Sequence, residues 1–312
     1  MPNPLNTSYS GHELFHDCAR KFEIEKLLLA GDKEDNIDFI TGHAIGEGAQ
    51  LLLQDHNIET SIWAAYKHWL KIGLDFEHKK KSFWRVVKHL EKFQAQTWPN
   101  LQAEGWELVY FTSSDSTRVP ACELSFRIIF PNGYIYRGYI DAVIYNVRTD
   151  TFAILEIKTT SINANVAMYQ NSFQGSSYSF VLDKITGRES YEVIYPVFEF
   201  PSGEQQVFSF VKQKNTKLRW LTSLALDFQM MDIYKEHKHW PMRGKSCYAF
   251  FKPCKWLGLC ELSNKALGKV AENGMDYAEQ PLDDKEYHFT FTLEELLQEA
   301  SAAAVNEKEL VT

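Results

Sequence analysis

Alternation of apolar and polar residues is clearest in the middle of the chain. Residues 123–130, 134–146 and 151–160 are runs rich in β-branched and aromatic residues, separated by the short polar turns PNG and VRTD. Such runs predict a three-stranded antiparallel meander. Residues 191–200 and 204–212 repeat the pattern and predict two more strands.

The segments on either side of the meander have a helical period. Most of residues 1–100 is predicted helical, beginning with HELFHDCARKFEIEKLLLA at residues 12–30. Residues 163–185 predict a helix with Asn163 as its cap, and residues 216–237 predict another. This order of elements predicts an α+β or mixed α/β fold, in which helices flank a central mixed β-sheet.

We expect one domain over residues 1–264. It comprises a helical part (1–100), a core (101–235) and a segment that carries three cysteines (236–264). Residues 265–312 hold 11 acidic and 4 basic residues, and they read as an acidic tail. Because this tail supplies most of the net charge of −8, the acidic balance does not exclude a nucleic-acid partner.

A basic stripe interrupts the otherwise acidic chain. Lys81, Arg85, Lys88 and Lys92 fall at helical spacing on one face. Such a stripe is either a solvated helix face or a surface that follows a phosphate backbone.

The chain offers no signal for a membrane or for secretion. No stretch reaches the roughly 20 uncharged apolar residues of a membrane span, and the N-terminus lacks the basic and apolar blocks of a secretory signal. We therefore expect a cytoplasmic protein. In that reducing compartment the five cysteines are expected as thiols or metal ligands rather than disulfides.

Two carboxylates interrupt the apolar strands of the meander. If the second hairpin is symmetric about its turn, Asp141 lies directly opposite Glu156, with Cβ atoms about 4.5–5.5 Å apart. Two ionised carboxylates that close repel each other unless a cation lies between them, and a hard divalent ion prefers oxygen ligands. Lys158 shares the face of Glu156, whereas Ile157 points to the core and leaves its carbonyl available to the ion.

This arrangement predicts phosphodiester hydrolysis. Mg²⁺ held by two carboxylates can polarise a phosphodiester and lower the pKa of a bound water, which a neighbouring lysine orients or deprotonates. In the helix that follows, Gln170, Gln174 and Tyr178 are four residues apart and share a face. They either join the site or are ordinary surface residues.

Together these motifs resemble the PD-(D/E)XK nuclease superfamily, in particular its RecB-like branch. The matching residues are GYID at 138–141, EIK at 156–158 and QGSSY at 174–178. The N-terminal SYSGHELFHDCARKF is similar to the opening helix of such proteins. The resemblance spans roughly residues 7 to 262 and implies a restriction-endonuclease-like core.

The resemblance also implies roles for the site residues. Asp141, Glu156 and the Ile157 carbonyl would hold Mg²⁺ or Mn²⁺, and Lys158 would serve the attacking water. Gln174 and Tyr178 would position DNA or the active-site groups.

One position departs from the pattern of the branch. Its members usually carry G-x-x-x-H in the early helix, where the histidine binds the metal, but here Gly46 stands at that place. We expect Glu47 to act as the substitute ligand. His43 and Glu123 are the alternatives.

Four cysteines form a second candidate centre. Iron-bearing members of the branch pair one early cysteine with three late ones around a [4Fe–4S] cluster, and Cys18, Cys247, Cys254 and Cys260 resemble that set. The spacing from Cys247 to Cys254 is longer than in that pattern. A Zn²⁺ site and four ordinary thiols remain open, while Cys122 is expected as a small core residue.

The sequence thus predicts a metal-dependent DNA nuclease, and more finely an exonuclease of recombination, repair or phage replication. No Gly-rich G-x-x-x-x-G-K-[ST] phosphate loop occurs, so an ATP-driven motor would be a separate recombination or helicase partner protein. The alternatives are a non-catalytic DNA-binding scaffold with the same fold and a site-specific endonuclease.

Overall fold

The computed structural model describes residues 5–28, 37–70, 72–73, 78, 80–112, 116–190, 192–249, 252–263, 265–267 and 286–298. The helices are α1 (Tyr9–Asp17), α2 (Ala19–Phe22), α3 (Ile37–Leu53), α4 (Ile58–Trp69), α5 (Phe83–Lys92), α6 (Trp98–Ala103), α7 (Ala167–Gln170), α8 (Phe173–Thr186) and α9 (Lys214–Glu236). Shorter helical turns are η1 (Glu23–Leu28), η2 (Phe93–Thr97) and η3 (Gly244–Cys247).

The strands are β1 (Asn6–Ser8), β2 (Trp106–Leu108), β3 (Tyr110–Thr112), β4 (Arg118–Pro120), β5 (Cys122–Ile129), β6 (Ile135–Asn146), β7 (Thr151–Leu155), β8 (Lys158–Thr160), β9 (Glu192–Glu199), β10 (Gln205–Val211), β11 (Tyr248–Ala249), β12 (Lys252–Pro253) and β13 (Phe289–Thr292).

The chain folds into two compact units. Unit 1 is made of Met1–Lys33, Phe126–Gly138 and Leu221–Thr312, and unit 2 is made of Glu34–Ser125 and Tyr139–Trp220. Strands β5 and β6 and helix α9 therefore contribute residues to both units.

Unit 2 is built on a mixed sheet with the strand order β10-β9-β7-β6-β5. Strands β10 and β9 are antiparallel, as are β7 and β6, whereas β7 and β9 are parallel. A parallel pair needs a crossover connection, and α7 with α8 supplies it between β7 and β9. The predicted mixed sheet with flanking helices is confirmed, as are the two later strands. The meander is confirmed except for its third strand, predicted over residues 151–160, which is divided into β7 and β8, and β8 pairs with β9 instead.

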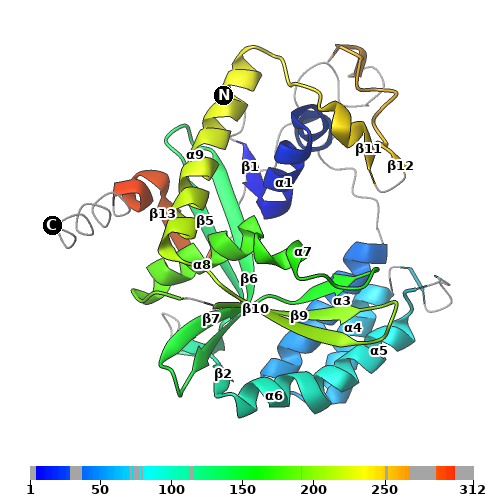
Figure 1. The fold of residues 1–312 in the computed structure, drawn as a ribbon, viewed down its shortest axis with the longest axis vertical. Coiled ribbons are helices and arrows are strands. Elements are labelled where there is room, and N and C mark those ends of the chain that lie inside the picture. The colour runs from blue at the N-terminus through cyan, green and yellow to red at the C-terminus, as the bar shows by residue number, and fades with distance from the viewer. Residues whose placement is uncertain are drawn as a thin grey trace. The chain divides into compact units, whose positions relative to one another are not determined.

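Helices cover both faces of the unit 2 sheet. On one face, side chains of α3, α4, α5 and η2, such as Trp69 and Leu90, share a core with Ile144 and Leu155 of the strands. Figure 1 shows α3, α4 and α5 side by side next to β9. Helix α8 contacts β7 and β9. Gly175 permits its close approach, because an added Cβ would lie 2.3 Å from the Tyr195 hydroxyl.

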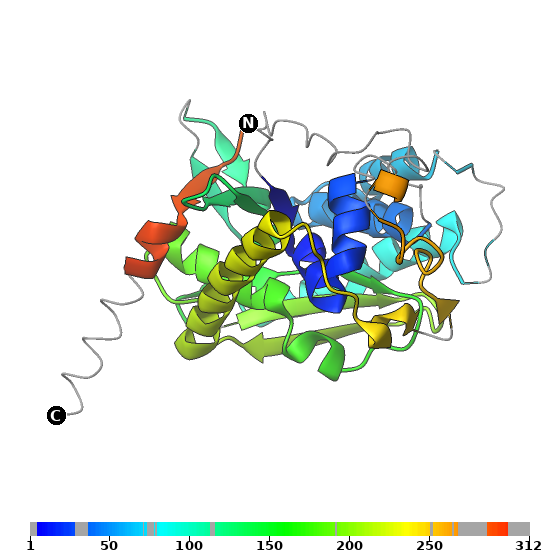
Figure 2. The same ribbon diagram turned by 90° about the horizontal axis from the view of Figure 1, so that it is seen from above.

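Unit 1 joins early and late parts of the chain. Strand β1 pairs in parallel with residues 135–137 of β6, and β13 pairs in parallel with residues 126–129 of β5. Helix α1 lies beside α9 in both ribbon views (Figures 1 and 2).

Strand β13 lies within the segment predicted as an acidic tail. The Phe-Thr-Phe-Thr alternation of Phe289–Thr292 is a strand pattern that the net charge of the segment obscured. Within residues 265–312 the structure describes 265–267 and 286–298, and the remainder of the predicted tail lies outside the described residues.

Two predicted helices are interrupted. The helix expected over residues 12–30 breaks at Cys18, whose backbone is extended, because the Arg20 N–H pairs with the Pro241 carbonyl at 3.1 Å. The helix expected over residues 163–185 is instead α7 followed by α8, and Asn163 precedes both. Lys212 Nζ caps the end of α7 by donating to the Gln170 carbonyl at 2.5 Å.

Most of the predicted basic stripe is engaged within the protein. Lys81 is buried and pairs with Asp38, and Lys92 pairs with Glu204. The Arg85 guanidinium donates to the backbone carbonyls of Lys80 and Phe200. These contacts argue against a path for phosphates, and the burial of Lys81 shows that the stripe is not a wholly solvated face either.

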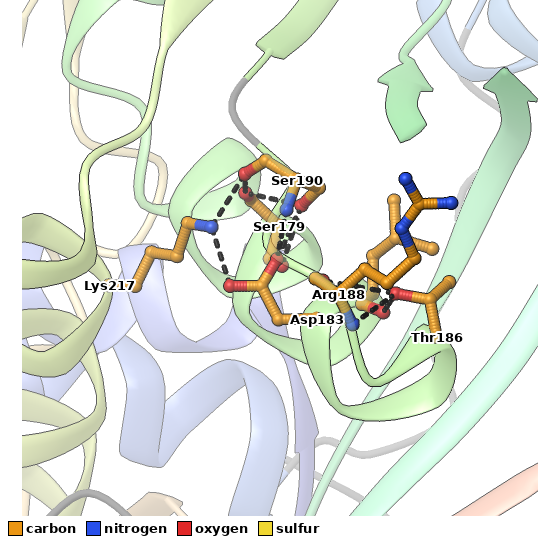
Figure 3. A network of polar contacts seen from close by, with 7 residues as sticks. Ser179, Asp183, Thr186, Arg188, Ser190 and Lys217 are labelled. Carbon is orange, nitrogen blue, oxygen red and sulfur yellow. Dashed lines mark hydrogen bonds and ion pairs between the residues drawn. The ribbon is translucent and has the colours of Figure 1, made fainter. Parts of the chain in front are cut away.

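A polar network fixes the C-terminal half of α8 (Figure 3). Asp183 accepts hydrogen bonds from the Ser190 N–H and hydroxyl, each at 2.7 Å, and from Lys217 Nζ at 2.6 Å. Lys217 also donates to the Ser190 carbonyl, and Ser179 bonds to Ser190. The Lys217 side chain is only 3% exposed, so its charge depends on this network.

None of the described helices is long and apolar enough to cross a membrane.

We predict that Asp183→Ala destabilises the protein by about 3–5 kcal/mol, because it leaves the buried Lys217 ammonium without its counter-charge. Urea unfolding measures the change. Glu204→Ala is the matched control, since it breaks the exposed pair with Lys92, and its unfolding midpoint should stay near that of the wild type. Adding Lys217→Met to Asp183→Ala should recover part of the loss. An equal effect of Asp183→Ala and Glu204→Ala would contradict the prediction.

Candidate active site

The two carboxylates face each other across the hairpin of β6 and β7. The register pairs Asn146 with Thr151 and Ala142 with Leu155, and one further step places Asp141 opposite Glu156. This is the register predicted from a symmetric turn, and it is confirmed. Beyond Leu155 the chain continues along β9, where the Glu156 N–H donates to the Ile194 carbonyl at 2.8 Å.

The backbone at Ile157 serves the site directly. Its N–H donates to Asp141 Oδ2 at 2.7 Å, so an amide of the E-I-K triplet binds the carboxylate of the neighbouring strand. The Ile157 side chain meanwhile belongs to the core on the opposite face of the sheet. This contact locks the position of Asp141 relative to Glu156.

Lys158 and Gln174 hold the second carboxylate. Lys158 Nζ donates to Glu156 Oε1 at 2.9 Å and to Gln174 Oε1 at 2.7 Å. Gln174 Nε2 donates to the same Glu156 oxygen at 2.6 Å and to the Tyr178 hydroxyl at 3.2 Å. The structure thus brings together Asp141, Glu156, Lys158, Gln174 and Tyr178, which the sequence had proposed from separate motifs.

Burial shifts the pKa values of the charged groups in this site. Burial and the nearby Glu156 raise the pKa of Asp141 well above its ordinary value, and burial likewise raises the pKa of Glu156 despite the nearby Lys158 ammonium. Burial alone would lower the pKa of Lys158, but the two carboxylates outweigh it and raise that pKa. An additional positive charge would relieve both acids.

The donor set fits a hard divalent cation. Glu156 Oε2 is buried, and no described group gives it a hydrogen bond. A buried oxygen without a partner is costly, and a metal ion is one group that satisfies it. Carboxylate and carbonyl oxygens are the ligands that Mg²⁺ and Mn²⁺ prefer.

A third carboxylate, Glu123 at the start of β5, belongs to the same electrostatic environment. Its charge contributes to the raised pKa of both Asp141 and Glu156. Gln50 Nε2 of α3 donates to Glu123 Oε1 at 2.7 Å and to the Asp141 carbonyl at 3.2 Å. Glu123 has a φ of 49°, in the left-handed region that non-glycine residues rarely occupy and that clusters at functional sites.

Sequence reasoning missed Gln50. The available signal was its spacing, because Gly42, Gly46 and Gln50 are each four residues apart and lie along one face of α3. An added Cβ at Gly42 would lie 3.9 Å from Thr159 Oγ1 of β8, and at Gly46 it would meet no described atom within 4 Å. Gly46, which stands where the family usually has a histidine, therefore lies on the same face of α3 as Gln50.

Glu47 is oriented differently from this face. Its carboxylate pairs with His68 of α4, and the His68 ring stacks on His43. The described contacts of Glu47 join α3 to α4, and none of them reaches Asp141 or Glu156. Its role as a metal ligand stays a prediction.

The four cysteines of the second candidate centre all belong to unit 1. Ser246 Oγ donates to the Asp17 carbonyl at 2.6 Å, the Cys254 N–H donates to the Cys247 carbonyl at 2.8 Å, and Arg20 Nε donates to the Cys260 carbonyl at 3.2 Å. These bonds hold the N-terminal helix against the late segment.

The charges of the other three thiols influence Cys260. Burial raises the pKa of Cys260, followed by the charges of Cys18, Cys247 and Cys254, with Arg20 opposing them. Cys122 lies elsewhere, in unit 2, against the core of the sheet, and burial raises its pKa to about 12. Cys122 thus belongs to a different unit from the other four cysteines.

Comparison with solved structures found several distant likenesses, two of which are described below. A candidate exonuclease from Eubacterium rectale is 13% identical, with a TM-score of 0.48, over 81% of this chain and 91% of its own. The protein SSO0001 is 15% identical, with a TM-score of 0.29, over 65% of this chain and 80% of its own. With scores below 0.5, neither likeness adds support to the fold or the function. No curated protein matches the chain.

The comparison with protein families is decisive. The model of the PD-(D/E)XK nuclease superfamily matches residues 6–261. This range contains the Asp141–Glu156–Lys158 constellation, the helix that carries Gln174 and Tyr178, and all the cysteines. The chain therefore belongs to the PD-(D/E)XK nuclease superfamily.

Proposed function

We propose that the protein is a metal-dependent DNA exonuclease. The observation that carries the proposal is the pair of opposed carboxylates, Asp141 and Glu156. Lys158 donates to Glu156 Oε1, and the other oxygen of Glu156, Oε2, is buried without a described hydrogen-bond partner. A structural ion pair needs no second carboxylate and no unpartnered oxygen. Membership of the nuclease superfamily supports hydrolysis of a phosphodiester as the reaction.

The metal would be held by Asp141, Glu156 and the Ile157 carbonyl. When bound, Mg²⁺ or Mn²⁺ supplies positive charge to the scissile phosphate and lowers the pKa of a bound water. The neighbouring groups of the protein favour the ionised form of both acids in part, against the burial that raises their pKa values, and the cation would favour it further. The Ile157 N–H fixes Asp141, while Lys158 and Gln174 fix one oxygen of Glu156 and leave the other for the ion.

Lys158 would orient the attacking water and stabilise charge. Because its pKa is raised, the ammonium keeps its proton near neutral pH and donates hydrogen bonds. Gln174 would set the direction of that ammonium through its Oε1 atom, and Tyr178 would hold the Gln174 amide. A protonated lysine of this kind stabilises negative charge that develops on the phosphate.

We further propose Glu123 as the third acidic group of the centre, in the place where other members have a histidine on the early helix. Gln50 would hold it there. The support is the charge coupling of Glu123 to both carboxylates and its unusual backbone conformation. Glu47 is the competing candidate from the sequence.

The exonuclease part rests on the RecB-like motifs and on the lack of a recognisable sequence-reading module. DNA is the proposed substrate, and recombination, repair or phage replication the proposed setting. A recombination or helicase protein is the proposed partner, since the sequence has no complete G-x-x-x-x-G-K-[ST] phosphate loop.

A [4Fe–4S] cluster on Cys18, Cys247, Cys254 and Cys260 is the second part of the proposal. The mutual influence of the four thiols supports a shared centre. Such a cluster would fasten the N-terminal segment to the late segment, and a zinc ion on the same thiolates is the alternative.

We predict that the pure protein degrades linear, end-labelled duplex DNA with Mg²⁺ or Mn²⁺ and spares covalently closed circles, and that EDTA stops the reaction. Asp141→Asn, Glu156→Gln and Lys158→Met should each lower the rate at least about a hundredfold. Gel assays of the labelled products measure both effects.

Asp150→Asn is the matched control, because Asp150 is an exposed carboxylate on the turn of the same hairpin. Rapid cutting of closed circles would favour the endonuclease alternative. Binding of DNA without hydrolysis under any metal would favour the scaffold.

The third acidic group is tested by a pair of isosteric changes. Glu123→Gln should lower the rate and weaken Mg²⁺ activation by about 10–100-fold, as expected for a group that supports a metal ligand. Glu47→Gln should have a smaller effect, because its described partner is His68. The measurement is the rate against Mg²⁺ concentration, and the reverse order of effects would return the role to Glu47.

The cluster is tested by colour. Protein purified without oxygen should be brown, with broad visible absorption that dithionite bleaches. Cys18→Ser or Cys260→Ser should remove the colour and lower the melting temperature, whereas Cys122→Ser should keep the colour. Colourless protein with stoichiometric zinc would replace the cluster by a zinc site, and colourless, metal-free protein of equal stability would leave only thiols.

A further inference from the structure

Two histidines and an aspartate meet in unit 1, in a place that the nuclease chemistry does not use. His12 and His16 are one turn apart on α1, and Asp227 comes from α9. The Nε2 atoms of both histidines lie 2.8 Å from the same Asp227 oxygen, Oδ2. The three atoms lie within 4.8 Å of one another, close enough to share one metal ion after small shifts.

Sequence and helix geometry explain why these side chains converge. Residues four apart on a helix present their side chains one above the other on one face, so both imidazoles of α1 reach the same point. The two rings are 4.7 Å apart and meet edge to face. Helix α9 runs beside α1 and carries the carboxylate to that point (Figures 1 and 2).

The group is sheltered from solvent. The Asp227 side chain is only 18% exposed, and that of His12 only 2%. Imidazole nitrogens and a carboxylate oxygen gathered in a sheltered place are a ligand set that a divalent metal ion accepts.

The geometry points to a zinc-binding site formed by His12, His16 and Asp227. Imidazole nitrogens favour Zn²⁺ over Mg²⁺ or Mn²⁺, so this site would select a different metal from the carboxylate centre of unit 2. Four tetrahedral ligands of zinc lie about 3.3 Å apart at ordinary Zn–N distances, so ligand atoms now 2.8 Å apart need only small shifts. His16 is 38% exposed, which leaves room for water as a fourth ligand.

A zinc ion here would have a structural role. It would tie the first helix of the chain to α9, more than 200 residues later in the sequence. The bond exists only in the folded chain, so its free energy adds to the stability of the fold. This site does not depend on the nuclease activity, nor on the iron–sulfur cluster.

The test uses the full chain with Asp141→Asn and Glu156→Gln, which removes metal binding by the carboxylate centre. Zn²⁺ is titrated into EDTA-stripped, desalted protein, and bound metal and melting temperature are measured. We expect one equivalent of Zn²⁺ beyond any held by thiols, with a melting temperature that rises with zinc concentration. His16→Gln and Asp227→Asn should each weaken this binding at least about tenfold. His16→Gln changes a partly exposed side chain, so the variant should fold, and circular dichroism checks it.

Cobalt identifies the ligands. Co²⁺ at this site should show weak visible bands without the intense near-ultraviolet absorption of a cobalt–thiolate bond, and His16→Gln should remove those bands. The control His237→Gln alters an exposed histidine just after α9 and should change nothing. If zinc binding is equal in the parent, His16→Gln and Asp227→Asn, or if the parent takes up zinc through thiols alone, the trio is a hydrogen-bonded cluster and the inference is wrong.

Discussion

Two carboxylates that face each other inside a sheet raise each other's energy, and much of unit 2 is arranged around that cost. Asp141 accepts a hydrogen bond from the Ile157 N–H, and Glu156 accepts hydrogen bonds from Lys158 and Gln174. Because Gln174 comes from α8, this helix must be held close to the sheet. Gly175 permits the approach, and the Asp183–Lys217–Ser190 network fixes the far end of the helix. Polar residues remote from the chemistry thus have a clear purpose in positioning it.

The register of the β6–β7 hairpin was predictable because local rules determine it. A four-residue turn and alternating apolar positions in both strands allow one pairing, since a slip of one residue would turn every side chain to the other face. Lys158 and Gln174 followed from the same alternation and from the helical period. The apolar-in, polar-out pattern therefore located most of the site without tertiary information.

What remained hidden depends on contacts between distant segments. Gln50 and Glu123 are 73 residues apart, and neither their pairing nor the left-handed backbone of Glu123 has a local signature. The break at Cys18 arises because Arg20 pairs with Pro241, which no periodicity reveals. Net charge concealed β13, because a strand of four residues is a small part of a long acidic segment. The N-terminal part of the chain makes two such distant contacts, through His12 of α1 and through Arg20 of α2.

Ile157 illustrates how one residue can be constrained from two sides. Its amide belongs to the site and its side chain belongs to the core, so chemistry and packing act on different atoms of the same position. Proline is excluded because it has no N–H to give, and polar residues are excluded because the side chain is buried. Among variants that arise in nature or in a mutant library, aliphatic residues of similar volume should therefore predominate at the middle of the triplet. A position written as "any residue" in the motif is in fact one of its narrowest.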